Sequence, residues 1–117
     1  MAIIGIVEDN KKIRDLIQRY LDMQKDMECA VAVDSVEEML DYLEKHQKPD
    51  VILMDIRLNG SMDGIEATQE ILANLDSTRV IYVTGNTDNA YKERAEKTGY
   101  DAYLIKPLRM EDLKSII

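Results

Sequence analysis

Five short apolar runs recur along the chain, and each is followed by a stretch with helical periodicity. We expect strands at Ala2–Val7, Glu28–Val33, Val51–Met54, Arg79–Thr84 and Ala102–Ile105. The first and third runs are almost continuously apolar, which is typical of strands that are covered on both faces. Regular strand–helix alternation with short connections predicts an α/β fold, with one parallel sheet and helices on both faces.

The stretches between the runs carry apolar residues at the spacing of a helix face. The first stripe consists of Ile13, Leu16, Ile17, Tyr20 and Leu21. A second helix is expected to begin after Ser35 as N-cap, with Glu38 completing a capping box, and a third after Asp63. A weaker pattern predicts a fourth helix over Asn89–Thr98, and a last one begins after Pro107.

The length and the composition of the chain are typical of a single globular domain. The chain has 117 residues, with 15 Lys and Arg against 23 Asp and Glu. The resulting net charge of -8 argues against a surface for nucleic acid. Cys29 stands alone, which excludes an internal disulfide and favours a small buried apolar residue. His46 is expected to end a helix, where the helix dipole favours it.

No apolar run approaches the length of a membrane span. The first residues enter a predicted strand directly and do not have the pattern of a signal peptide. We therefore expect a cytoplasmic protein that does not contact a membrane.

Polar side chains follow four of the five predicted strands at the point where each strand ends. They are Glu8, Asp9, Asp55, Thr84 and Lys106. In an open parallel sheet, ligands bind beyond the carboxyl ends of the strands. Carboxylates that are packed together repel one another and need a cation, so three of them predict a divalent-metal site beside an anion-binding lysine. Such a combination suits phosphoryl transfer.

Each of these residues also has a plainer interpretation when it is taken alone. Asp9 or Asn10 could simply cap the first helix. Asp55 could be a polar strand end, Lys106 a solvated charge, and Tyr103 a core residue. The prediction of a site depends on the joint placement, at strand ends, of the acidic pair, Asp55, Thr84 and Lys106.

A second hypothesis is a flavin-binding electron carrier. Thr84-Gly85-Asn86-Thr87 resembles the phosphate loop of flavodoxins. In flavodoxins that loop follows the first strand, whereas here Glu8 and Asp9 follow it and would repel a phosphate.

The joint pattern resembles the receiver domain of two-component response regulators. The matching motifs, in order, are Val7-Glu8-Asp9-Asn10, Leu53-Met54-Asp55-Ile56, Met62-Asp63-Gly64-Ile65-Glu66, Val83-Thr84-Gly85 and Gly99-Tyr100-Asp101-Ala102-Tyr103-Leu104-Ile105-Lys106-Pro107. The resemblance implies one receiver domain over residues 1–117. It also implies a flavodoxin-like, doubly wound sheet of five parallel strands in the order 2-1-3-4-5.

The resemblance implies a role for each residue of the predicted metal site. Asp55 would accept a phosphoryl group from a phosphohistidine on a sensor histidine kinase or phosphotransfer protein. Glu8, Asp9 and Asp55 would hold Mg²⁺ together with the backbone carbonyl of Arg57. One departure concerns the turn after Asp55, which is one residue longer than usual and has Asn59 where a proline is common.

Three further residues take roles from the same resemblance. Thr84 and Lys106 would each bind a phosphoryl oxygen, and Tyr103 would turn inward as Thr84 moves, so that the two form the switch. The bond between Lys106 and Pro107 is expected to be cis.

The implied protein is not an enzyme in the usual sense, because it would catalyse only its own phosphorylation and dephosphorylation. The family resemblance also suggests a homodimer. The short final helix leads us to expect a longer parent protein with an output module. A third hypothesis, a receiver-like interaction module without phosphorylation, is not favoured because all five key residue types are present.

Overall fold

The computed structural model describes residues 1–58, 62–75, 77–85 and 89–117. Its strands are β1 (Ala2–Val7), β2 (Met27–Val33), β3 (Val51–Met54), β4 (Arg79–Thr84) and β5 (Ala102–Ile105). They form one parallel sheet in the order β2-β1-β3-β4-β5. The predicted fold class and strand order are therefore confirmed, and β2 begins one residue earlier than expected.

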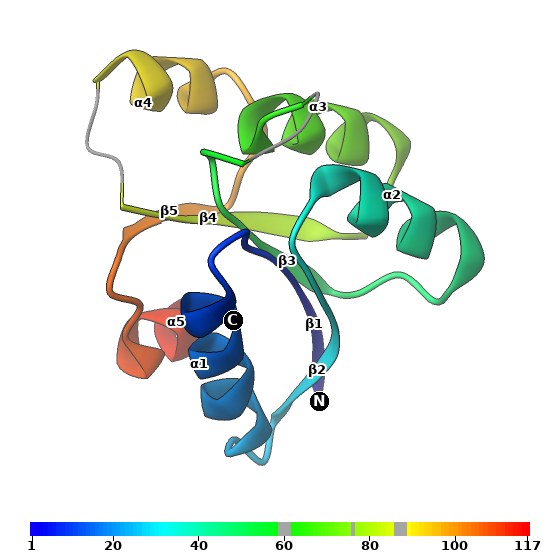
Figure 1. Ribbon diagram of the computed structural model, residues 1–117, viewed down its shortest axis with the longest axis vertical. Helices are drawn as coiled ribbons and strands as arrows, with labels where there is room; N and C mark the ends of the chain where they lie inside the picture. The colour runs from blue at the N-terminus through cyan, green and yellow to red at the C-terminus, as the bar shows by residue number, and fades with distance from the viewer. Residues whose placement is uncertain (59–61, 76, 86–88) are drawn as a thin grey trace.

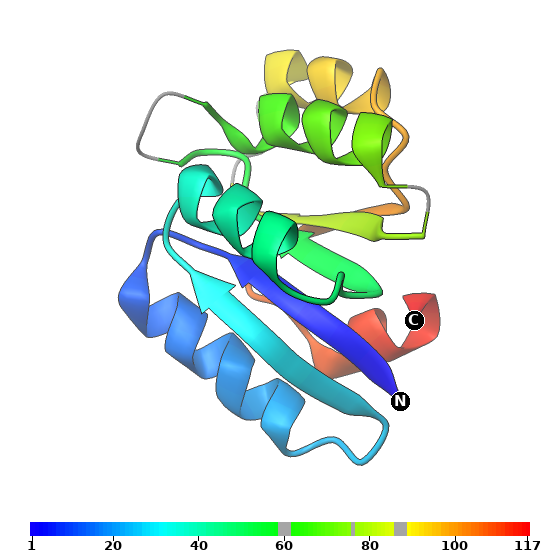
Figure 2. The ribbon, with the colours of Figure 1, turned by 90° about the vertical axis from the view of Figure 1, so that its right-hand side faces the viewer.

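Helices cover both faces of the sheet. They are α1 (Lys11–Asp22), α2 (Val36–Lys45), α3 (Gly64–Asn74), α4 (Asn89–Glu96) and α5 (Met110–Ile116). Figures 1 and 2 show α2, α3 and α4 on one face and α1 with α5 on the other. None of the helices in the described ranges is long and apolar enough to cross a bilayer.

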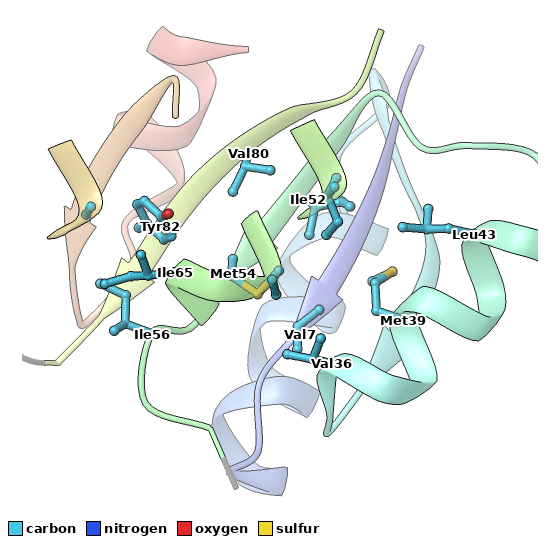
Figure 3. Packing of buried hydrophobic residues seen from close by; sticks show 13 residues of the cluster. Val7, Val36, Met39, Leu43, Ile52, Met54, Ile56, Ile65, Val80 and Tyr82 are labelled. Carbon is cyan, nitrogen blue, oxygen red and sulfur yellow. The ribbon is translucent and has the colours of Figure 1, made fainter. Parts of the chain in front are cut away.

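The sheet separates two apolar clusters, because successive strand side chains point to opposite faces. In β3, Ile52 and Met54 join the cluster under α2 and α3, whereas Leu53 joins the cluster under α1 and α5. Figure 3 shows the first cluster, with Tyr82 from β4 and Met39 from α2 pointing into it. The continuous apolar run of β3 is thus explained by burial on both faces.

The N-caps of α1 and α2 test two of the predictions made from the sequence. Asn10 is the N-cap of α1 and accepts a hydrogen bond from Ile13 N at 3.2 Å, so Asp9 is not the cap. In α2, Ser35 accepts from Glu38 N at 3.3 Å, but only this half of the predicted capping box forms. The Glu38 side chain is exposed, so its carboxylate does not need the Ser35 N–H as a partner.

The complete capping box lies at the start of α3. The Asp63 carboxylate accepts from Ile65 N and Glu66 N at 3.0 and 2.9 Å, and Glu66 accepts in return from Asp63 N at 3.2 Å. This confirms Asp63 as N-cap. The helix α4 ends at Glu96, before Thr98, the end that the sequence predicted. The Thr98 hydroxyl donates to the Ala95 carbonyl at 2.6 Å and so competes with the helical backbone bond.

The apolar stripe of α1 is buried only in part. Ile17 and Leu21 are buried, whereas Leu16 and Tyr20 remain 44% and 36% exposed. A helix that packs against a sheet on one side buries a face narrower than the five-residue stripe of α1, so residues at the border of the stripe stay exposed. Leu16 and Tyr20 instead line a shallow groove with Pro107.

Two further side chains were expected to be structural, and one of them is less buried than predicted. Cys29 is only half-buried, because β2 is an edge strand, and burial raises the pKa of its thiol to about 11. His46 ends α2 as expected: its backbone N–H donates to Tyr42 O at 2.9 Å, and the two rings stack at 4.5 Å.

Candidate functional site

The register of the sheet brings the polar strand ends to one edge. Asp55 N donates to Val7 O at 3.0 Å, which places the residue after β3 beside the end of β1, where Glu8 follows. Lys106 N donates to Thr84 O at 2.9 Å, which joins the ends of β4 and β5 in the same way. The convergence that the strand ends predicted is therefore present in the backbone.

Glu8, Asp9 and Asp55 form a compact cluster of carboxylates. One oxygen from each lies within 4.8 Å of the other two. Glu8 and Asp55 are only 2% and 6% exposed, and Asp9 is partly exposed. Carboxylate oxygens are the hard ligands that Mg²⁺ prefers, so this donor set fits a magnesium ion.

The Lys106 ammonium lies against two of these carboxylates. It forms ion pairs with Glu8 and with Asp55, the latter at 3.2 Å. Burial by itself would lower the pKa of Lys106, but the hydrogen bond from Lys106 to Glu8 and the charge of Asp55 outweigh it and raise that pKa. Lys106 therefore keeps its positive charge beside the acidic cluster. The bond to Pro107 is cis, as the family resemblance implied.

Two carboxylates of the cluster, those of Glu8 and Asp9, have a raised pKa. Burial raises the pKa of Glu8, although its hydrogen bonds from Lys106 and Asn10 act in the opposite direction. Burial also raises the pKa of Asp9, and the neighbouring Glu8 carboxylate raises it further. The charged cluster thus costs free energy without a cation, and a bound divalent ion would offset that cost.

The turn after β1 fixes the position of Glu8. Its carboxylate accepts from Asn10 N at 3.0 Å, and its backbone carbonyl accepts from Arg14 Nη1 at 2.8 Å. Because Asn10 caps α1, the Asp9 carboxylate is available to the cluster.

Gly64, which sequence reasoning did not single out for the site, allows α3 to approach Asp55. A Cβ atom at Gly64 would lie 1.9 Å from the Asp55 carbonyl oxygen, and Gly64 N donates to Ile56 O at 2.9 Å. The glycine directly after the Asp63 N-cap was the available sequence signal.

The loop that follows Asp55 carries the proposed carbonyl ligand. Arg57 is exposed, and its guanidinium carbon lies 5.5 Å from the centre of the Tyr91 ring. The role of the Arg57 carbonyl stays a prediction. Asn59, the departure from the usual turn, lies outside the described residues.

The two residues of the predicted switch lie on neighbouring strands. Thr84 is 1% exposed at the end of β4. Tyr103 is partly buried on β5, opposite Tyr82, with 5.9 Å between the ring centres, and Tyr100 completes the group of rings. Their movement stays a prediction.

The alternative flavin loop finds no support at the acidic edge. Its Asn86 and Thr87 lie outside the part of the chain that the structure describes. Glu8 and Asp9, which follow β1 where flavodoxins have their phosphate loop, lie in the carboxylate cluster, which would repel a phosphate group in the absence of a bound metal ion.

Replacing Asp9 with asparagine should stabilise the metal-free domain. Because folding raises the Asp9 pKa, its charge opposes folding at a pH above its ordinary value of 3.8. The advantage of Asp9→Asn should therefore be absent at lower pH and reach about 1 kcal/mol near neutrality. Urea denaturation in EDTA across this pH range tests this, with Asp26→Asn on the surface as control. Equal stability of Asp9→Asn and wild type at neutral pH would contradict it.

A family model described as the response regulator receiver domain matches residues 4–117. Response regulator protein VraR from Staphylococcus epidermidis is 33% identical over 119 residues, which cover 100% of this chain and 56% of that protein. Transcriptional regulatory protein DegU from Brevibacillus brevis is 30% identical over 110 residues, covering 94% of this chain and 46% of that protein. The chain thus spans about half the length of these relatives.

Solved structures of similar proteins have the same fold. A DNA-binding response regulator of the LuxR family from Staphylococcus aureus superposes with a TM-score of 0.89 at 27% identity. The match covers 99% of this chain and 95% of that one.

Proposed function

Because this chain belongs to the response regulator receiver domain family, we propose that it is a signalling domain switched by phosphorylation of Asp55. The observation that carries this proposal is the buried Asp55 carboxylate, which lies in contact with the Lys106 ammonium and within a cluster of three acids. Such an arrangement can bind a cation and a phosphoryl group side by side.

The proposed step transfers a phosphoryl group from a phosphohistidine to Asp55. A carboxylate oxygen of Asp55 attacks phosphorus, a new P–O bond forms, and the P–N bond to the imidazole breaks. The leaving imidazole takes up a proton. Later attack by water returns the carboxylate and releases inorganic phosphate, so the domain would catalyse only its own phosphorylation and dephosphorylation.

The residues around Asp55 would position and neutralise the phosphoryl group. Lys106 already contacts Asp55 and would pair with one phosphoryl oxygen, and the Thr84 hydroxyl would bind another. Glu8, Asp9 and Asp55, with the Arg57 carbonyl, would hold Mg²⁺. When bound, Mg²⁺ supplies positive charge that stabilises the transferring phosphoryl group.

The switch would use Thr84 and Tyr103. A phosphoryl group adds nearly two negative charges and new hydrogen-bond acceptors, which is enough to bias a loop with two arrangements. Thr84 would move toward the phosphoryl group. The Tyr103 ring, which lies beside Tyr82, would then turn into the space that Thr84 leaves.

The partners we infer are a histidine kinase or phosphotransfer protein and a second copy of the domain, in the cytoplasm. DegU is named a transcriptional regulatory protein, and the Staphylococcus aureus structure a DNA-binding response regulator. Control of transcription is therefore the output that we propose. The chain itself, with its net charge of -8, would not bind the nucleic acid.

Incubation with acetyl phosphate and Mg²⁺ should add one phosphoryl group to the wild-type domain. Intact-mass measurement should detect this adduct, and Asp55→Asn or EDTA should abolish it. Asp41→Asn, which changes an exposed acid, should keep it. An adduct that survives Asp55→Asn, or no adduct on the wild type, would overturn the proposal.

A further inference from the structure

The helix α4 has an unusually small share in the apolar core. Among its side chains that the structure describes, those of residues 90–96, Ala95 alone is buried. Tyr91 is partly buried and packs against the edge of the cluster under α2 and α3. Tyr91 and Arg94 also reach the connection between β3 and α3, which contains Asp55. The position of α4 therefore depends in part on contacts at the rim of the phosphorylation site.

These contacts form a continuous group, here called the latch: Arg57, Tyr91, Arg94 and Asp63. The Tyr91 ring has one guanidinium carbon 5.5 Å from its centre, that of Arg57, and another at 5.7 Å, that of Arg94. Arg94 Nη2 also pairs with Asp63 Oδ2 at 2.9 Å.

The latch joins the two ends of the connection between β3 and α3. Arg57 stands two residues after Asp55, and Asp63 is the N-cap of α3. Asp63 uses its other oxygen for the cap, so Arg94 binds a carboxylate whose position is already fixed. The Arg94 end of the latch is thus anchored by an ion pair, whereas the contact described for the Arg57 end is a cation–π contact.

A phosphoryl group on Asp55 would compete for Arg57. Guanidinium binds phosphate through charge-assisted hydrogen bonds, which are stronger than the contact of an exposed guanidinium with an aromatic ring. Arg57 is exposed and close to Asp55 in the chain, so its side chain can change partner.

We propose that the latch is charge-sensitive: phosphorylation of Asp55 opens it at the contact between Arg57 and Tyr91 and thereby loosens α4. This inference depends on the proposed function, because Asp55 must carry the charge. Arg94 stays bound to Asp63, so α4 loosens at the Tyr91 end and does not detach.

Hydrogen exchange of the α4 amides in the full chain tests the latch. The probe is beryllofluoride with Mg²⁺, a stable mimic of a carboxyl-bound phosphoryl group. In the wild type, adding the probe should raise α4 exchange about two- to fivefold, the size of one exposed cation–π contact. Fluorine NMR reports separately whether beryllofluoride has bound.

Two variants remove the contact from opposite sides. Arg57→Gln keeps the backbone carbonyl and removes the cation, whereas Tyr91→Leu keeps apolar bulk and removes the ring. Each should show the raised exchange without the probe and respond little when it binds. Lys92→Gln removes an exposed charge from the same helix and should behave as wild type.

The outcomes separate this inference from the proposed function. Failure of beryllofluoride to bind the wild type would remove both. Binding with unchanged or reduced α4 exchange would overturn the latch alone. The same would follow if Arg57→Gln matched the wild type without the probe, or kept its full response when the probe bound.

Discussion

Replacing Gly64 with alanine should destabilise the domain by about 3 kcal/mol and slow phosphorylation of Asp55 by about a hundredfold. The new Cβ would lie 1.9 Å from the Asp55 carbonyl oxygen and 2.9 Å from the Ile56 Cα. Both neighbours are backbone atoms, so no side chain can rotate away to relieve the clash. The start of α3 must move away from β3, and the Asp55 backbone moves with it.

Urea denaturation measures the stability of Gly64→Ala, and the rate of adduct formation with acetyl phosphate measures the site. Gly99→Ala is the matched control, because its Cβ would meet only the Leu72 side chain at an ordinary 3.6 Å. That variant should stay within about 1 kcal/mol of the wild type. A Gly64→Ala protein with wild-type stability and phosphorylation would show that the approach of α3 to Asp55 is not needed.

Replacing Lys106 with methionine should destabilise the metal-free domain by about 3 kcal/mol near neutral pH, because it leaves Glu8 and Asp55 buried without their cation. Methionine keeps most of the apolar length of the lysine side chain, so the loss concerns the charge. Added Mg²⁺ should stabilise Lys106→Met more than the wild type, since it would replace the missing positive charge.

The pH dependence of Lys106→Met has a defined sign. The Glu8 pKa is raised by folding even with Lys106 present, and losing the ammonium would raise it further. The destabilisation should therefore be small below the ordinary Glu8 pKa of 4.5 and grow as the pH rises above it. Lys11→Met is the control, because its pair with Asp15 is exposed and should contribute little to stability. A deficit that does not change with pH would contradict this account.

The fold and the convergence of the site could be predicted from local patterns. Apolar runs such as Val51–Met54 specify strands because burial on both faces requires them to be apolar throughout. A parallel sheet then places Glu8 and Asp55 at one edge whatever the loops do. The role of Asp55 as phosphoacceptor, in contrast, came from the family resemblance.

Contacts between distant residues could not be predicted from the sequence. Arg94 and Asp63 are 31 positions apart, and no periodicity links them. Asn10 caps α1, and the Asp9 side chain lies in the carboxylate cluster. The order of residues alone fits either of them as the cap. The position of Leu16 in the apolar stripe of α1 fits a buried side chain, yet Leu16 is exposed. Its exposure depends on how α1 lies on the sheet, which the spacing does not show.

Separation of the core by the sheet has an evolutionary consequence. Ile17 and Leu113 pack on one side, while Tyr82 and Ile65 pack in a separate cluster on the other. Substitutions on opposite sides should therefore have additive effects on stability. A lineage can then remodel α1 and α5 while the side of the core that contains the tyrosine rings stays unaltered.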